Sequence, residues 1–343
     1  MFFCNIRYLN DSIPYFFVSF YYFEELRIGL EIEFLYKNYT IYNHDTRFLK
    51  EKTYIEDVKS GPRVCRFCGK SQNEVRFKKD AHAIPNMLAN QYLLSKHECD
   101  ECNQYFSRLE NDFGNYTLFI RSMLRQKGKK GYPKFKRNNF KVETVLYEKE
   151  EQKERLKISD EIGSNRVEEH EETNSIIITG EKDSYIPIAV YKCLVKVALT
   201  LMPNTQIKYF SRSIKWILEK DHSKGNPNSK LLMFELLTSP YFFESPLVLL
   251  HIRKENALTD LPYALCKIYF GYMMYQFYIP MSEKDKNKKM TFRPLIIERS
   301  GMTSSRLNCV DLSSPELKKG EKEILEMTYG EKKPVPKELL KEL

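Results

Sequence analysis

The chain has 343 residues, of which 42% are hydrophobic and 29% charged, and its formal net charge is +9. This composition is typical of a soluble globular protein with a substantial buried core and room for two or three domains. An apolar run, residues 13–23, is too short to span a bilayer and lacks the basic leader and cleavage site of an export signal. We therefore expect no membrane segment and a cytoplasmic, reducing compartment; the positive charge permits a polyanionic partner.

Residues 1–59 form an N-terminal extension rich in Phe, Tyr, Ile and Leu, with little periodicity. Two interpretations stay open: a packed helical or strand extension, or residues upstream of the true start. We assign no function to this extension.

Residues 60–138 are predicted to form one module. Residues 74–85 have the pattern of a strand, a turn and a return strand, with Val75 and Phe77 on one face. From Glu101 to Gln126, apolar residues recur at spacings of three and four, which predicts an amphipathic helix.

A basic run, residues 121–138, follows that helix and contains no acidic residue. Its glycines and proline predict a loop. The acid-rich stretch 147–173 is predicted to be an exposed hairpin or loop.

The second half, residues 139–314, is predicted to be a separate domain of helices and antiparallel strands. Its predicted helices are 187–203 and 211–220, and its predicted strands are 231–238, 246–253, 264–280 and 290–298. The charged tail, residues 315–343, is predicted to be a helix followed by a loose end. The fold class is therefore α+β.

Two Cys-x-x-Cys pairs, Cys65 with Cys68 and Cys99 with Cys102, enclose thirty residues. In a reducing compartment this spacing is typical of two zinc knuckles that share one ion. Four thiolates close the coordination sphere, so the predicted Zn²⁺ is structural. It would tie together the ends of the enclosed loop, in which His82 stands shortly before a proline.

The stretch "CRFCGK…FKKDAHAIP…LAN…ECDECNQYF" resembles the HNH endonucleases, or ββα-metal nucleases, in their four-cysteine zinc variety. The resemblance covers about residues 63–135. It implies a zinc-stapled ββα-metal module that hydrolyses phosphodiester bonds of DNA with the help of a catalytic divalent cation, with Mg²⁺ as the first candidate.

The resemblance also implies roles for individual residues. His82 matches the histidine that deprotonates the attacking water, and its ordinary pKa suits a general base. Asn90 matches the asparagine that holds the loop, and Asn103 matches the final residue of the motif, which ligates the catalytic cation.

The chain departs from the family pattern at Ala81, where many members carry an acidic metal ligand. Asp80 and Glu110 are the candidate replacements, and Asp112 is a further one; each could instead be an ordinary solvated acid. His97, near the zinc cysteines, could support a zinc ligand or lie free on the surface.

The basic run fits a phosphate-binding loop, with Tyr132 and Phe135 interleaved among its charges. Its predicted DNA contacts are Lys127, Lys129, Lys130, Lys134, Lys136 and Arg137. The region after residue 139 resembles domains appended to some bacterial HNH proteins, which could bind a regulatory protein or a ligand.

Three hypotheses follow from the sequence. The chain is a metal-dependent DNA endonuclease, which by analogy could act in bacterial defence; or a non-catalytic, zinc-dependent nucleic-acid-binding protein; or an assembly protein whose zinc only stabilises the fold. The substituted Ala81 favours the second hypothesis, and the set of His82, Asn90 and Asn103 favours the first.

Overall fold

The structure is a computed structural model. It describes residues 6–9, 32–55, 62–128, 130–148, 153–161, 163–225, 231–237, 242–258, 260–295 and 307–328. Within these residues the chain combines helices with four mainly antiparallel sheets, so the predicted α+β class is confirmed.

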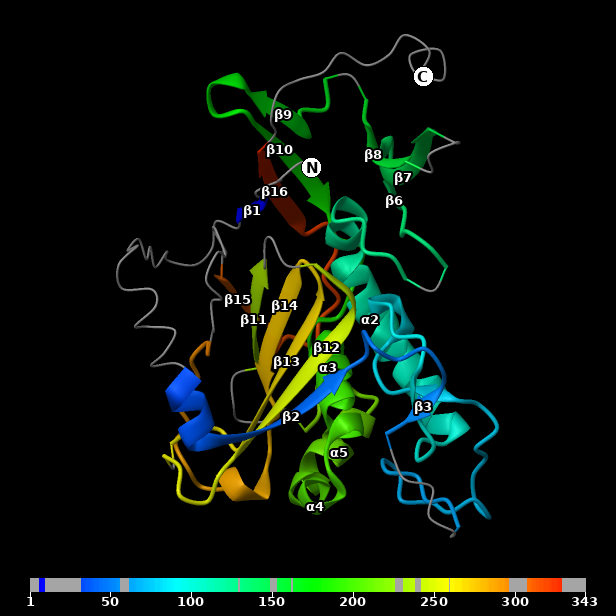
Figure 1. The fold of residues 1–343 in the computed structure, drawn as a ribbon, viewed down its shortest axis with the longest axis vertical. Helices are drawn as coiled ribbons and strands as arrows, with labels where there is room; N and C mark the ends of the chain where they lie inside the picture. The colour runs from blue at the N-terminus through cyan, green and yellow to red at the C-terminus, as the bar shows by residue number, and fades with distance from the viewer. Residues whose placement is uncertain are drawn as a thin grey trace.

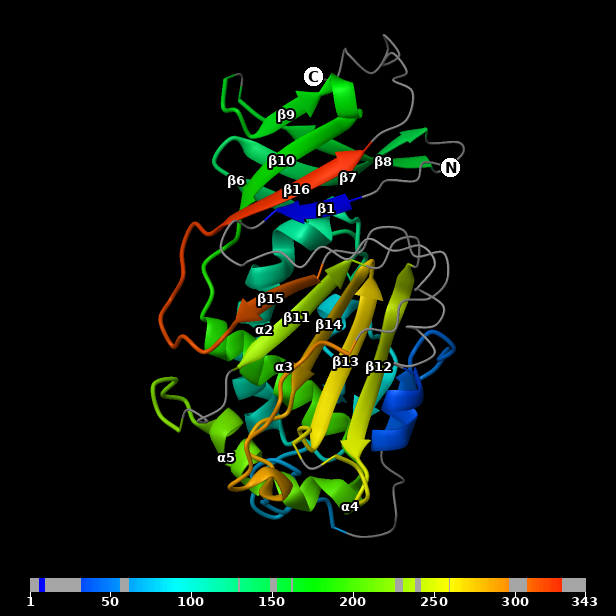
Figure 2. The same cartoon turned by 90° about the vertical axis from the view of Figure 1, so that its left-hand side faces the viewer.

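The largest sheet has six antiparallel strands in the order β15-β11-β14-β13-β12-β2 (Figures 1 and 2). Their bounds are Leu307–Asp311, Leu232–Leu237, Met273–Tyr278, Ala264–Gly271, Phe243–Arg253 and Tyr39–Asp45. The strands are rich in β-branched, aromatic and Leu residues, which suit a pleated, buried surface. The edge strand β2 comes from the N-terminal extension and pairs with β12. Within the extension, this segment is therefore a packed strand.

Two helices cover one face of this sheet (Figures 1 and 2). α2 spans Asp100–Met123 and α3 spans Pro187–Leu201, and all fifteen residues of α3 are buried. The shorter helices α4 (Asn204–Ile207) and α5 (Ser211–Leu218) follow α3. The helices predicted at 101–126, 187–203 and 211–220 are therefore present, because their apolar periodicity matches the face that each one buries.

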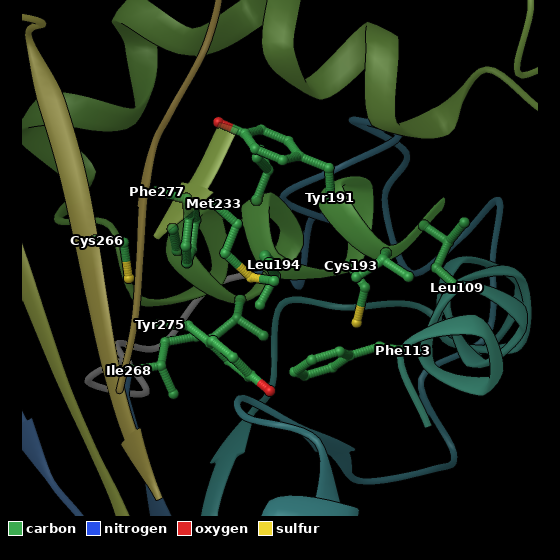
Figure 3. Packing of buried hydrophobic residues seen from close by; sticks show 14 of the residues in the cluster. Leu109, Phe113, Tyr191, Cys193, Leu194, Met233, Cys266, Ile268, Tyr275 and Phe277 are labelled. Atoms are coloured by element: carbon green, nitrogen blue, oxygen red, sulfur yellow. The ribbon is translucent and has the colours of Figure 1, made fainter. Parts of the chain in front are cut away.

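The main core lies between α2, α3 and the large sheet (Figure 3). Phe113 of α2 meets Tyr275 of β14 with ring centroids 5.8 Å apart. Cys193 of α3 lies beside Phe113 in the same layer. The core runs without interruption across residue 138, the boundary that the sequence predicted for the nuclease module; the division into domains stays a prediction.

Two smaller sheets meet the C-terminal end of α2 (Figure 1). One has the order β1-β16-β10-β9, and these strands span Ile6–Leu9, Lys322–Thr328, Ser175–Glu181 and Val167–His170. The other has the order β6-β7-β8, and these strands span Phe135–Arg137, Phe140–Glu148 and Lys153–Ser159. The hairpin of β7 and β8 and the exposed strand β9 match the exposed hairpin expected in residues 147–173.

The fourth sheet belongs to the cysteine module and has the order β3-β5-β4. β3 (Thr53–Tyr54) runs parallel to β5 (Leu93–Ser95), and β4 (Ala81–His82) is antiparallel to β5. A single 3₁₀ turn, η1 (Asn86–Leu88), lies between β4 and β5. In chain order, β4, β5 and α2 form a ββα unit. The remaining 3₁₀ turns are η2 (Glu171–Thr173), η3 (Lys208–Phe210) and η4 (Glu283–Asp285).

The prediction of two strands in residues 74–85 is wrong in its first half. Only Ala81 and His82 form a strand, and their partner is β5 rather than residues 74–78. Val75 and Phe77 instead pack as irregular chain against the main core. The alternation of Val75 and Phe77 is typical of a strand. Both side chains are partly buried near the cysteine cluster instead, and this packing keeps residues 74–78 irregular.

Three further predictions need correction. Residues 264–280 form the hairpin of β13 and β14 rather than one strand. Residues 290–295 form no strand, and 296–298 lie outside the described residues. The helix expected after Pro315 is instead strand β16, which pairs with β10 and β1 on its two sides; residues 329–343 lie outside the described part. Charged residues of high helix propensity adopt a strand there because two neighbouring strands pair with them.

Among the described residues, no helix is both long enough and apolar enough to cross a membrane.

Gly180 of β10, in the β1-β16-β10-β9 sheet, packs closely against α2. A Cβ at this position would lie 2.5 Å from Cε2 of the buried Phe119 ring. We expect Gly180→Ala to lower the free energy of unfolding by about 1–3 kcal/mol because the core must shift to accept it. Chemical denaturation measures the change. Gly128→Ala, whose Cβ would meet ordinary contacts at 3.6 Å, is the control, and an equal loss in both variants would contradict the overpacking argument.

Candidate functional site

The four paired cysteines lie together in one cluster. Their Sγ atoms are all within 4.8 Å of one another, and Cys68 Sγ is 3.8 Å from Cys99 Sγ. A tetrahedral zinc ion with Zn–S bonds of about 2.3 Å places its sulfurs about 3.8 Å apart. The cluster therefore fits a structural Zn²⁺ held by four thiolates.

The two knuckles come from different local structures. Gly69 has a φ of +72°, and its amide donates to Cys65 O at 2.9 Å, so the chain turns tightly beneath the first pair. Cys99 is the N-cap residue of α2, and its sulfur accepts from the Cys102 amide at 3.5 Å. The second knuckle is therefore the first turn of the helix.

The thiol pKa values differ strongly within the cluster. Hydrogen bonds from the Cys102 side chain and from backbone amides lower the pKa of Cys65 to about 4. Burial raises the pKa of Cys99 to about 12, and the Cys65 thiolate raises that of Cys102 further. One thiolate therefore keeps its neighbours protonated, and all four can ionise together only around a shared positive charge such as Zn²⁺.

His97 connects the two knuckles. Its Nδ1 lies 3.1 Å from Val64 O, and its own carbonyl accepts from the Arg66 amide at 2.7 Å. The ring is thus engaged with the backbone beside the cluster, and among the described cysteines and histidines it is not one of the four grouped ligands.

Asn90 closes the loop between β4 and β5. Its Nδ2 donates to Ile84 O at 2.8 Å and to Leu93 O at 2.9 Å, and its Oδ1 accepts from Leu93 N at 2.9 Å. The side chain is fully buried. These bonds fix the ends of the loop that carries η1 and begins just after His82. The role expected of Asn90 in the site stays a prediction.

His82 ends strand β4, and its imidazole contacts Asn86 of η1. His82 Nε2 and Asn86 Nδ2 are 3.2 Å apart, while Asn86 Oδ1 is buried with no hydrogen-bond partner among the described residues. The two ends of a carboxamide have nearly the same shape, so the group fits in either orientation. With the amide turned over, Oδ1 accepts from Nε2–H, and Asn86 Nδ2 takes the buried position in its place. Nδ1 of His82 then carries the lone pair, and this atom is itself buried.

The two candidate carboxylates near the motif have different surroundings. Asp80 forms an ion pair with Lys52 at 2.6 Å, and the Lys52 ammonium lowers the pKa of the Asp80 carboxyl. Glu110 is largely enclosed, and burial raises its pKa. Asp112 accepts from Ile186 N at 2.7 Å and so anchors the start of α3.

Asn103 lies in the first turn of α2, directly after Cys102, and is half-buried. Glu110 follows about two helical turns later, on the same side of the helix. The described residues contain no second group of three His, Cys, Asp or Glu gathered as metal ligands. Ligation of a catalytic cation by Asn103, Asp80 and Glu110 therefore stays a prediction.

Part of the basic run lies against η1, the turn that follows His82. A Cβ on Gly128 would lie 3.6 Å from Met87 O and 3.9 Å from Asn86 O, so this part of the run lies directly against η1. Arg121 binds the same turn from α2, since its guanidinium donates to Met87 O at 3.5 Å and to Gly114 O at 3.2 Å.

The predicted DNA contacts differ in their exposure. Lys127, Lys130 and Lys136 are exposed, and Lys129 lies outside the described residues. Lys134 pairs with Glu143 at 3.2 Å, and Arg137 pairs with Glu181 at 2.9 Å. Phe135, which the sequence places among these charges, takes no part in the exposed surface, because its ring is fully buried against Phe119 and Phe140.

Sequence reasoning missed three residues around this site. Asn86 was visible only as the residue after Pro85, and Lys52 lies in the extension to which no function was assigned. Lys196 donates to His82 O at 3.3 Å from α3, more than a hundred residues away. The one available signal was a lysine inside an otherwise apolar helix.

Residues 65–117 match the family model of an HNH endonuclease. The match begins at the first zinc cysteine and ends within α2, so it includes His82, Asn90 and Asn103. Together with the four-cysteine cluster, it identifies this segment as an HNH endonuclease module of the zinc-containing variety. The basic run, α3 and the large sheet lie outside the matched residues. No curated protein and no solved structure matches the chain.

We expect Cys99→Ser to release the zinc and to loosen the hairpin and the start of α2, because the substitution removes one of the four thiolate ligands. Serine can still cap the helix, so the loosening reports on loss of the metal. Metal analysis and amide hydrogen exchange over residues 62–128 measure the two effects. Cys309→Ser, in β15 and outside the cluster, is the control and should keep its zinc. Retention of both zinc and protection in the Cys99 variant would contradict the structural role.

Proposed function

We propose that the chain is a metal-dependent HNH endonuclease that hydrolyses phosphodiester bonds in DNA. The observation that carries the proposal is the joint position of three features. The His82 imidazole contacts Asn86, Asn90 closes the loop that follows His82 and holds Asn86, and the basic run lies against the same 3₁₀ turn. A proton acceptor and a phosphate-binding segment therefore meet at one place on the zinc-pinned hairpin.

In this proposal His82 is the general base. Its Nδ1 is buried in the structure and must become accessible before it can take a proton from a water molecule; the resulting hydroxide oxygen then attacks phosphorus. The bond from phosphorus to the leaving oxygen breaks, and the leaving oxygen takes a proton from solvent. Asn86, with Oδ1 on Nε2–H, holds the neutral tautomer that can accept the proton and stabilises the imidazolium that forms.

Asn103 is the residue proposed to hold the catalytic divalent cation, with Asp80 and Glu110 as further candidate ligands. When bound, a cation such as Mg²⁺ supplies positive charge beside the scissile phosphate and the leaving oxygen. Lys52 already pairs with Asp80, so this carboxylate must give up that ion pair before it can ligate a metal.

The exposed lysines of the basic run are proposed to bind the DNA backbone. Lys127, Lys130 and Lys136 carry charges that face solvent, whereas Lys134 and Arg137 are engaged with acidic partners. Phosphate contacts of this kind give affinity without choice of sequence. A role in bacterial defence, and binding of a regulatory protein or ligand by residues 139–314, stay expectations from the resemblance.

The catalytic assignment is tested with plasmid DNA in Mg²⁺ or Mn²⁺. We expect His82→Ala to lower the cleavage rate on the order of 100- to 10,000-fold, as expected for the loss of a general base. Asn86→Ala should lower it less, and both variants should keep zinc and bind DNA. Cleavage at the normal rate by His82→Ala would exclude His82 as the base, and salt-dependent binding without cleavage by the native protein would favour the non-catalytic alternative.

The DNA contacts are tested through the salt dependence of binding. We expect Lys127→Ala with Lys130→Ala to weaken binding equally for unrelated sequences. The slope of log Kd against log salt should fall by about 0.9 for each phosphate that a lysine no longer neutralises. Lys286→Ala with Lys289→Ala, which removes two exposed lysines after β14, is the control of equal charge. If the two double variants behave alike, only net charge matters and the basic run is not the interface.

A further inference from the structure

Lys196 is a fully buried lysine in a helix that is otherwise almost entirely apolar. Its side chain is 1% exposed, and its Nζ lies 3.0 Å from Oε2 of the fully buried Glu98. A lysine in the interior costs free energy unless its ammonium is paired and hydrogen-bonded. The Glu98 carboxylate, just before the zinc ligand Cys99, supplies the opposite charge, and the His82 carbonyl supplies a hydrogen bond.

The same ammonium also contacts the strand that carries the proposed base. Lys196 Nζ donates to His82 O at 3.3 Å. The carbonyl of His82 and the amide of Ala83 belong to one peptide group, and the Ala83 amide donates to Leu93 O at 3.1 Å. This peptide is therefore held from both sides, once by β5 and once by Lys196.

Strand β4 needs such support because it has only two residues, Ala81 and His82. A strand of this length makes too few ladder bonds to fix the direction of its last side chain. A small displacement of a catalytic group can lower a rate about 100-fold. The backbone of His82 is thus a point at which support from another element matters.

α3 is itself fixed to the zinc module at both ends. Arg66, inside the first knuckle, donates to Met202 O at 2.6 Å and to Leu199 O at 3.2 Å. At the other end, Asp112 of α2 accepts from Ile186 N. Lys196 lies between these anchors, so its ammonium is presented to His82 from a rigid helix.

We infer that Lys196 is a positioning residue for His82, supplied by a helix outside the matched HNH segment. The inference rests on the proposed nuclease function and extends it, since the module would need α3 for full activity. Glu98 holds the ammonium in place, and Lys196 in turn fixes the peptide group after His82.

Lys192 provides a matched control on the same helix. It lies one turn earlier and is equally buried, but its Nζ donates to Glu219 O at 2.7 Å and lies 3.3 Å from His222 Nδ1. Both of these partners belong to the chain after α5 rather than to β4. Loss of Lys192 should disturb α3 without acting on His82.

The experiment compares Lys196→Met, Lys192→Met and the double variant Lys196→Met with Glu98→Gln in the full chain. The double variant removes the buried carboxylate paired with Lys196, so it should recover part of the stability that the single Lys196 variant loses; Glu110, which also interacts with the Lys196 ammonium, is unchanged. We expect zinc content and KM for DNA to stay unchanged in all three. We expect kcat to fall about 10- to 100-fold in both Lys196 variants and to stay near the native value in Lys192→Met.

A spectroscopic measurement separates this inference from the nuclease proposal. The ¹³C′ shift of His82 and the ¹⁵N shift of Ala83 report on the shared peptide group, and both should change in the double variant but not in Lys192→Met. If the double variant recovers stability together with native kcat and native shifts, Lys196 is only structural and the inference fails. If the native protein cleaves no DNA, the proposed function fails. The positioning role is then judged by the His82 ¹³C′ and Ala83 ¹⁵N shifts alone, and it fails too if these shifts are unchanged in the double variant.

Discussion

The four-cysteine cluster is the constraint on which the rest of the site depends. It joins the chain before β4 to the first turn of α2, and the thirty residues between the pairs contain only two very short strands and one 3₁₀ turn. So little regular structure cannot hold a loop of this length by backbone bonding alone. A metal ion bound by all four sulfurs closes the loop at its base, while Asn90 closes it near its tip.

Closure of the loop by the cysteine cluster and Asn90 also determines which groups surround His82. Its ring meets Asn86 within the same loop, its carbonyl meets Lys196 from α3, and the neighbouring turn meets Arg121 and the basic run. The module therefore does not stand alone. One hydrophobic core passes from α2 through α3 to the large sheet, and α3 contacts the strand that carries His82 through Lys196.

Burial of charge at this junction has a physical cost that only pairing offsets. Glu98 and Lys196 are both removed from solvent, and burial raises the pKa of Glu98 to about 7 against the opposing effect of the Lys196 ammonium. Such pairs contribute little net stability compared with apolar packing, but removal of one partner leaves an isolated buried charge. The stability of the protein therefore depends more strongly on the exact positions of Glu98 and Lys196 than on those of the apolar residues around them.

The sequence by itself determined the features that depend on local spacing. Cys-x-x-Cys pairs, a His-x-Ile-Pro motif and apolar residues every three or four positions identified the zinc cluster, the HNH module and the helices α2, α3 and α5, because each pattern reflects chemistry within a few residues. The tertiary structure alone decided the features that depend on distant partners. Strand β16 replaced an expected helix because β1 and β10 pair with it, Phe135 was buried by Phe119, and Lys196 reached His82 through helix packing that no local pattern encodes.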